Sequence, residues 1–170
     1  SRKDMEAIAA ILARHPDVWI YADEIYSRLV YDGEFASLAS IPGMLERTII
    51  SDGASKTWAM TGWRVGWLQA PRELGPVIER IIQYNTSGTA AFLQRGCVAA
   101  LDNGDEFIAM QVTRALASRD LVVNFLREFP QIRFEVPTGA FYMFFKIEGM
   151  TDSAATARRL IDEAGVGFAP

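Results

Sequence analysis

The chain has 170 residues, of which 50% are hydrophobic, and it carries a formal net charge of −4. This length and composition allow one medium-sized domain with a buried core, or parts of two domains. The small negative charge gives the chain as a whole no electrostatic reason to bind nucleic acid or an anionic membrane surface. Its apolar runs are far shorter than the roughly 20 residues that a bilayer-spanning helix needs.

A single cysteine, Cys97, and a single histidine, His15, limit the chemistry further. One cysteine cannot form an internal disulfide, which fits a reducing compartment, so we expect a cytoplasmic protein. One histidine with one cysteine provides no metal-ligand set, and no metal site is expected. The start, Ser1 to Asp4, lacks signal-peptide character, and both ends of the sequence resemble cut positions, so we expect a fragment of a longer protein.

The first predicted element is an amphipathic helix over residues 4–14, with Asp4 near its start as a cap. Three apolar runs of strand length follow, at residues 18–22, 48–50 and 65–70. Because these runs are unbroken rather than alternating, they predict strands that are buried on both faces, as in a parallel sheet. Asp23 directly follows the first run. Polar residues at the carboxyl ends of parallel strands collect at one edge, where open α/β sheets bind their ligands.

The middle of the chain has the spacing of helices. Apolar stripes predict helices over about residues 74–82 and 91–101, and we expect the first stripe to belong to the core. A third helix, from residue 106 to about residue 129, contains no Gly or Pro. Its length suits a helix that bridges two domains.

The last part of the chain has a different pattern. Strict alternation over residues 132–136 predicts a strand with its apolar side chains inward, and residues 140–147 are expected to return as a second strand. This hairpin indicates an antiparallel piece of a second, smaller domain. Asp152 or Ser153 is expected to cap a last helix, and Gly165 is well placed to end it.

Five side chains of complementary chemistry lie around the predicted strand ends. Asp23 and Tyr26 follow the first strand, Ser55 and Lys56 follow the second, and Arg64 precedes the third. Together they offer the groups that pyridoxal phosphate (PLP) needs. Its aldehyde forms a Schiff base with a lysine, its ring nitrogen stays protonated beside a carboxylate, and its phosphate suits a forked guanidinium and small donors. Taken singly, each residue also has a plainer explanation as a loop, turn or ion-pair residue.

Three segments carry a resemblance to a known family: Ala22-Asp-Glu-Ile-Tyr26, Ala54-Ser-Lys-Thr-Trp-Ala-Met-Thr-Gly-Trp-Arg-Val-Gly66 and Pro137-Thr-Gly-Ala-Phe-Tyr142. In this order they resemble the class I/II PLP-dependent aminotransferases of fold type I, in particular the aspartate aminotransferase family. The resemblance implies an α/β fold with a three-layer large domain, a mainly parallel sheet and the start of a small α+β domain. It assigns residues 1–104 to the large PLP-binding domain, 105–130 to an interdomain helix and 131–170 to part of the small domain.

The same resemblance implies a role for each of the five residues. Lys56 is the catalytic residue and the Schiff-base lysine. Asp23 would pair with the pyridine nitrogen and Tyr26 would bond to the 3-oxygen of the cofactor. Ser55 and Arg64 would hold the phosphate.

Other parts of the family pattern are missing from this chain. Many relatives have a second hydroxyl three residues before the lysine, where this chain has Gly53, so contact with the phosphate there is limited to the backbone. A further contact with the cofactor ring is expected before Ser1, and the arginine that binds the substrate carboxylate is expected beyond Pro170. We therefore expect the 170 residues alone to be inactive.

The implied function is transamination of an amino acid to a 2-oxo acid, with an aspartate-type or related substrate. By resemblance we expect a homodimer whose partners are small molecules and not nucleic acid or membrane. Two alternatives stay open. Another fold-type-I PLP enzyme, such as a C–S lyase or an aminocyclopropane-carboxylate synthase, would keep the cofactor and change the reaction. A non-enzymatic PLP-binding sensor domain of a transcription regulator would keep the cofactor alone.

Overall fold

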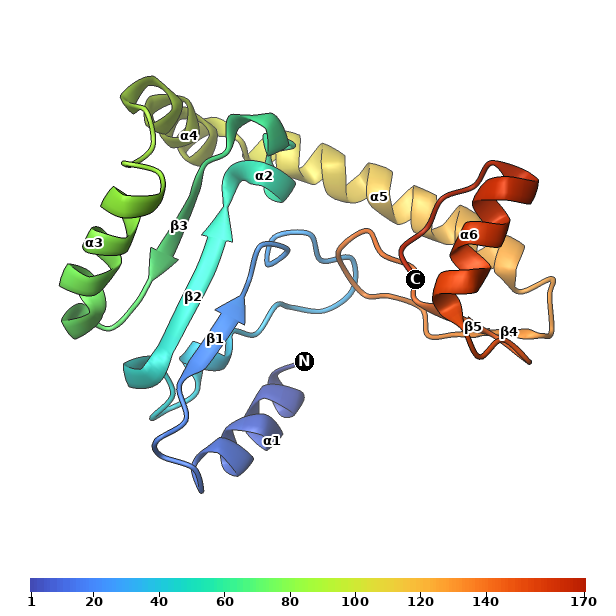
Figure 1. The fold of residues 1–170 in the computed structure, drawn as a ribbon, viewed down its shortest axis with the longest axis horizontal. Coiled ribbons are helices and arrows are strands. Elements are labelled where there is room, and N and C mark those ends of the chain that lie inside the picture. The colour runs from blue at the N-terminus through green and yellow to red at the C-terminus, as the bar shows by residue number, and fades with distance from the viewer. The chain divides into compact units, whose positions relative to one another are not determined.

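The computed structural model describes residues 1–170, drawn as a ribbon in Figure 1. The chain forms two compact units. The first unit comprises residues 1–116 and 138–140, and the second comprises residues 117–137 and 141–170. The division falls within helix α5 (Asp105–Leu126). None of the helices has the length and hydrophobicity that a bilayer-spanning segment requires. The domain limits expected from the sequence stay a prediction.

A three-stranded sheet in the order β1-β2-β3 forms the centre of the first unit. Strand β1 (Ile20–Asp23) pairs in parallel with β2 (Thr48–Gly53), and β3 (Gly66–Gln69) pairs with β2 in the antiparallel direction. Figure 1 shows the arrowheads of β1 and β2 at one end of the sheet and that of β3 at the other. All three predicted strands therefore form. The start of β3 lies at the same edge as the ends of β1 and β2.

The expectation that the strands are buried on both faces is wrong for β1 and β3. The side chain of Tyr21 in β1 is 66% exposed, and that of Leu68 in β3 is 46% exposed. Both strands lie at the edges of the sheet, and each has only β2 as a neighbour. An unbroken apolar run indicates that both faces of a strand are apolar. The exposed fraction of its side chains depends on which other segments pack against those faces.

Helix α1 (Arg2–Leu12) packs against the start of β1. The buried residues of this cluster are Ala9, Ile20, Ile41 and Met44. The helix starts two residues earlier than predicted. Ser1, rather than Asp4, caps it, because the Ser1 side chain accepts a hydrogen bond from the Asp4 backbone N–H. Asp4 completes a capping box by accepting from the Ser1 backbone.

A second core cluster connects the sheet to the helices that follow it. Its buried residues are Ala54, Trp58, Val65, Cys97 and Ile108. Four of them come from or adjoin three helices, α2 (Ala54–Thr57), α4 (Ala91–Asn103) and α5, and Val65 directly precedes β3. Short 3-10 helices occupy four of the loops: Leu38–Ser40, Leu45–Arg47, Thr61–Trp63 and Arg72–Leu74. The cluster thus packs against the segment between β2 and β3.

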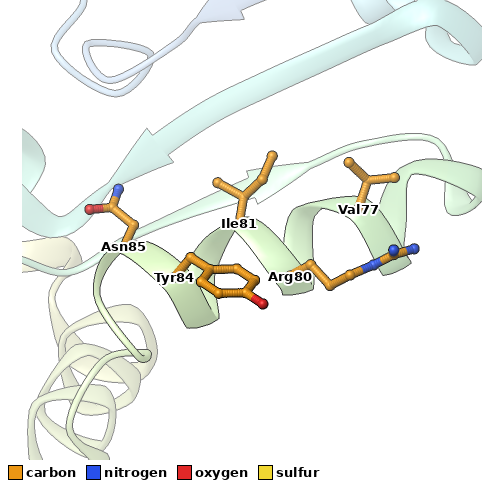
Figure 2. Close-up of a pocket in the computed structure, with 5 residues that line it drawn as sticks. All are labelled: Val77, Arg80, Ile81, Tyr84 and Asn85. Carbon is orange, nitrogen blue, oxygen red and sulfur yellow. The ribbon is translucent and has the colours of Figure 1, made fainter.

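Helix α3 (Gly75–Asn85) forms where predicted, but its apolar stripe is not part of the core. No residue of α3 is buried, and the side chains of Val77 and Ile81 are 49% and 59% exposed. Figure 2 shows both residues with Arg80, Tyr84 and Asn85 along one open surface of the helix. The amphipathic pattern thus predicted the helix correctly, and the prediction that the stripe is core was wrong.

The second unit contains a short antiparallel hairpin and a helix. Strands β4 (Ile132–Phe134) and β5 (Phe145–Ile147) pair with Ile132 opposite Ile147. Helix α6 (Ser153–Ala164) is capped by the Asp152 side chain, which accepts a hydrogen bond from the Ala155 N–H. Gly165 ends the helix with a φ of 65°, which confirms its predicted role as the stop.

The predicted strand over residues 140–147 is shorter in the structure, and residues 138–140 belong to the first unit instead. Gly139 forms an isolated antiparallel bridge with Val30, and the Ala140 N–H donates to the Leu29 carbonyl at 2.7 Å. A Cβ on Gly139 would lie 2.7 Å from that carbonyl oxygen. A glycine is therefore needed where this segment meets the loop after β1.

Candidate functional site

The register of the sheet brings the first two predicted segments to one edge. Asp23, the last residue of β1, lies opposite Ser51 of β2. The Asp23 carboxylate is exposed, and it accepts a hydrogen bond from the Ile25 N–H at 3.3 Å. This local bond closes a turn directly after β1, and half-buried Tyr26 follows in the same loop.

Ser55 and Lys56 lie on the single turn of helix that follows β2. Helix α2 has only four residues, of which Ala54 and Thr57 are buried. Ser55 and Lys56 are half-buried between them. The buried pair fixes the helical turn to the core, while Ser55 and Lys56 keep part of their surface exposed.

Arg64 is linked to this turn through a single intermediary. Its guanidinium donates to the Thr61 carbonyl at 2.9 Å, and the Thr61 hydroxyl donates to the Ser55 carbonyl at 3.0 Å. Arg64 has a φ of 54° and a ψ of 45°, which is the left-handed region. For a residue other than glycine this conformation costs of order 1–3 kcal/mol and is concentrated at functional sites. The exposed Arg64 side chain thus lies at the edge that carries Ser55.

The close approach of β2 and β3 explains the glycine before the lysine. Gly53 lies opposite Gly66. A Cβ on Gly53 would lie 2.9 Å from the Val65 carbonyl oxygen and 3.5 Å from the Ile25 side chain. The hydroxyl that many relatives have at this position therefore has no room here, and Ile25 covers the place where it would start.

An open cavity of about 770 Å³ lies beside the sheet, between β2 and β3 on one side and α3 and α4 on the other. Asp52 and Cys97 line it, and none of the five predicted cofactor residues does. Burial raises the pKa of the Cys97 thiol. Burial also raises the pKa of Asp52, against the lowering effects of the Gly53 N–H and of Arg28. The cavity is thus separate from the edge that carries the predicted chemistry.

The structure gathers the five predicted residues around one edge of the sheet. Asp23 and Tyr26 come from the loop after β1, Ser55 and Lys56 from α2, and Arg64 from the start of β3. The donor set fits PLP: an amine for its aldehyde, a carboxylate for its ring nitrogen, a phenol for its 3-oxygen, and a hydroxyl with a guanidinium for its phosphate.

Sequence reasoning missed the residues that hold this set together. Thr61 connects Arg64 to Ser55, and Ile25 packs over Gly53. Neither residue type has a pattern that distinguishes it from an ordinary loop residue. Their roles depend on the three-dimensional pairing of β2 with β3.

Comparison with known proteins gives a consistent result. The profile of the family described as aminotransferase class I and II matches residues 1–170. An aspartate/prephenate aminotransferase from Cereibacter sphaeroides is 36% identical over 98% of this chain and 45% of its own length. An arginine–pyruvate transaminase from Pseudomonas aeruginosa is 37% identical over 97% of this chain and 42% of its own length.

The fold leads to the same family. The crystal structure of an aspartate aminotransferase from Rhizobium meliloti matches with a TM-score of 0.92 and 33% identity, over 100% of this chain and 46% of that one. The chain thus spans less than half the length of the relatives it matches. Its fold is that of the fold-type-I aminotransferases, which are PLP-dependent enzymes. By profile, sequence and fold, the chain belongs to the class I and II aminotransferase family.

Proposed function

We propose that the whole protein containing this chain is a PLP-dependent aminotransferase, which transfers the amino group of an amino acid to a 2-oxo acid. One observation carries the proposal: α2 presents the Lys56 amine at the sheet edge that also carries Asp23, with Arg64 tied to the same turn through Thr61. Membership of the family supports the reaction class.

Each residue has a role that follows from its chemistry and position. When bound, the cofactor supplies an electron sink through its protonated ring. The Asp23 carboxylate would keep that ring nitrogen protonated, and the Tyr26 phenol would donate to the 3-oxygen. Ser55 and Arg64 would hold the phosphate, since a guanidinium fork matches phosphate oxygens in two places. Lys56 would bind the cofactor aldehyde, and its Nζ atom would take up and return the proton of the substrate α-carbon.

For the substrate we propose a class of amino acid and not a single compound. The two relatives described above have similar identity to this chain and different substrates in their names, aspartate or prephenate in one and arginine in the other. We therefore propose an amino acid of the aspartate type or a related one. We also propose a cytoplasmic homodimer, which is consistent with the exposed apolar surface of α3.

Reduction with borohydride tests the proposal directly. Within this chain the lysines are Lys3, Lys56 and Lys146, so peptide mapping distinguishes Lys56 from the other two. We expect reduction of the whole protein with PLP to attach the label to Lys56. Lys56→Ala should lose the label and about 10²–10⁴-fold in turnover, because it removes the general base.

Lys146→Ala is the matched control, because Lys146 is exposed and lies in β5 of the second unit. It should keep both label and turnover. Labelling at another lysine, or full turnover in folded Lys56→Ala protein, would refute the assignment. Labelling at Lys56 together with release of ammonia, and without amino transfer to any 2-oxo acid, would indicate a lyase instead.

A further inference from the structure

Trp58, two residues after Lys56, has an environment that core packing does not explain. Its side chain is only 7% exposed and belongs to the core cluster under the site. Its indole Nε1 is buried and has no hydrogen-bond partner. A buried N–H without a partner loses its hydration and gains nothing in return. An aliphatic side chain would fill apolar space without this cost, so the aromatic ring needs a reason beyond apolar packing.

The junction between α4 and α5 is shaped around this indole. A Cβ on Gly104 would lie 2.3 Å from the Trp58 Nε1 atom, 2.6 Å from its Cδ1 atom and 2.3 Å from the Ala100 carbonyl oxygen. Gly104 has a φ of −90°, which any residue adopts, so the requirement for glycine here is one of space. The backbone at Gly104 therefore forms one wall against the edge of the ring.

Arg28, in the loop after β1, lies over the indole ring of Trp58. Its guanidinium carbon lies 5.5 Å from the centroid of the Trp58 ring, within the range of a cation–π interaction. The same guanidinium is 3.6 Å from the carboxylate of Asp105, the first residue of α5. Arg28 follows Tyr26 by two residues. It thus connects the loop after β1 with the turn that carries Lys56.

We propose that the Arg28–Trp58 contact is a positioning link that sets the Lys56 amine relative to Tyr26 and Asp23. The Trp58 ring packs between Gly104 and the Arg28 guanidinium. This contact fixes the position of the loop after β1 relative to the end of α2. Arg28 and Trp58 act through Lys56 and Tyr26 and do not themselves take part in the reaction. The proposal rests on the proposed function, because it assumes that Lys56 binds the cofactor.

Variants of the whole protein, loaded with PLP, test the link. Arg28→Gln removes the charge, and Trp58→Leu removes the aromatic face while keeping an apolar side chain. We expect each to lower kcat by up to about 10²-fold with little change in KM, as displacement of a reacting group by about 1 Å does. Each should also lower the visible circular dichroism per bound cofactor, which reports how rigidly the cofactor is held. A purely structural role would lower occupancy or stability without changing this normalised signal.

The conservative variants should restore the signal. Arg28→Lys keeps a cation over the ring and Trp58→Phe keeps an aromatic face, so both should approach wild type. The double variant Arg28→Gln/Trp58→Leu should be no worse than the more damaging single variant, because both changes remove one contact. Arg159→Gln, which removes an exposed arginine paired with Glu163 at 2.9 Å, is the matched control and should behave as wild type.

Two outcomes separate this inference from the proposed function. If borohydride labels Lys56 in the wild type while Arg28→Gln and Trp58→Leu keep the wild-type dichroism per cofactor, the positioning link is wrong and the proposed function stands. If the wild type is not labelled at Lys56, both are wrong. Additive losses in the double variant also overturn the link. Arg28 is half exposed, so Arg28→Gln keeps the test open if Trp58→Leu does not fold.

Discussion

Gly53 and Gly66 face each other where β2 and β3 pair, and a side chain added at either would press on backbone. A Cβ on Gly53 would lie 2.9 Å from the Val65 carbonyl oxygen, and one on Gly66 would lie 3.0 Å from the Asp52 carbonyl oxygen. Both contacts are with backbone, which cannot rotate away. This pair sets how closely the end of β2, and therefore the turn with Lys56, approaches the start of β3 with Arg64.

Gly53→Ser should therefore disrupt the site although it introduces the hydroxyl that many relatives have. Forcing an added side chain into a filled space costs about 1–3 kcal/mol of stability. We expect urea denaturation of the whole protein to show that loss, and PLP titration to show no gain in affinity. Gly62→Ser is the matched control, because a Cβ there meets nothing within 4 Å. Tighter PLP binding by Gly53→Ser would contradict this explanation.

The grouping of the candidate residues at one edge of the sheet was predictable from sequence, and the reason is local. The residue types that PLP needs lie within a few positions of apolar runs that form strands, and the parallel register of β1 with β2 then brings Asp23 to the edge. The supports of the site were not predictable. Thr61 bonds to Ser55 and to Arg64 only because the loop folds back, and Gly104 meets Trp58 although the two lie far apart in the sequence.

Arg64 offers a test of the phosphate assignment. Hydrogen bonds to charged groups contribute about 1.5–3 kcal/mol, so Arg64→Ala should weaken PLP binding by about 10- to 100-fold. Arg64→Lys keeps the positive charge but loses the forked guanidinium, so its affinity for PLP should lie between those of the wild type and Arg64→Ala. Equilibrium titration monitored by visible absorbance measures these affinities. Arg80→Ala, on α3, is the control, since the Arg80 Nε donates only to the Pro76 carbonyl within its own helix. Equal affinity in Arg64→Ala and wild type would remove Arg64 from the site.

Burial was the part of the fold that sequence patterns predicted least well. The stripe of α3 has the spacing of a core helix, yet Val77 and Ile81 are about half exposed. Tyr21 lies in a run that predicts a fully buried strand, and it is 66% exposed. Periodicity encodes which side of an element is apolar. Exposure depends on what packs against that side, and this information is not contained in the element itself.

Arg47 stabilises the end of α1 from a distant position in the chain. Its guanidinium donates to the carbonyl of Leu12, the last residue of the helix, at 2.7 Å and to that of His15, just after the helix, at 2.6 Å. A cation at this end also complements the helix dipole. We expect Arg47→Ala to lower the free energy of unfolding by about 1–3 kcal/mol, measured by urea denaturation. Arg14→Ala, an exposed position at the same end, should cost less than about 0.5 kcal/mol. Similar losses in the two variants would contradict this role.

Asp52 gives the stability a definite dependence on pH. Burial raises its pKa above the ordinary 3.8, and the neighbouring Asp23 carboxylate raises it further, while the Gly53 N–H and the Arg28 guanidinium oppose the rise. The folded protein therefore keeps the Asp52 proton to a higher pH than the unfolded chain does. The stabilising contribution of this proton is complete below pH 3.8 and is lost as the pH rises through the raised pKa.

Asp52→Asn removes this titration and keeps an oxygen that accepts from the Gly53 N–H, which wild-type Asp52 does at 2.6 Å. The free energy of unfolding of the variant, minus that of the wild type, should therefore become more positive as the pH rises from about 4, and then level off. Urea denaturation of both proteins between about pH 4 and 8 measures the difference. Asp102→Asn serves as the control for the loss of one exposed carboxylate. A difference that falls as the pH rises has the opposite sign, and it would mean that burial does not dominate the Asp52 environment.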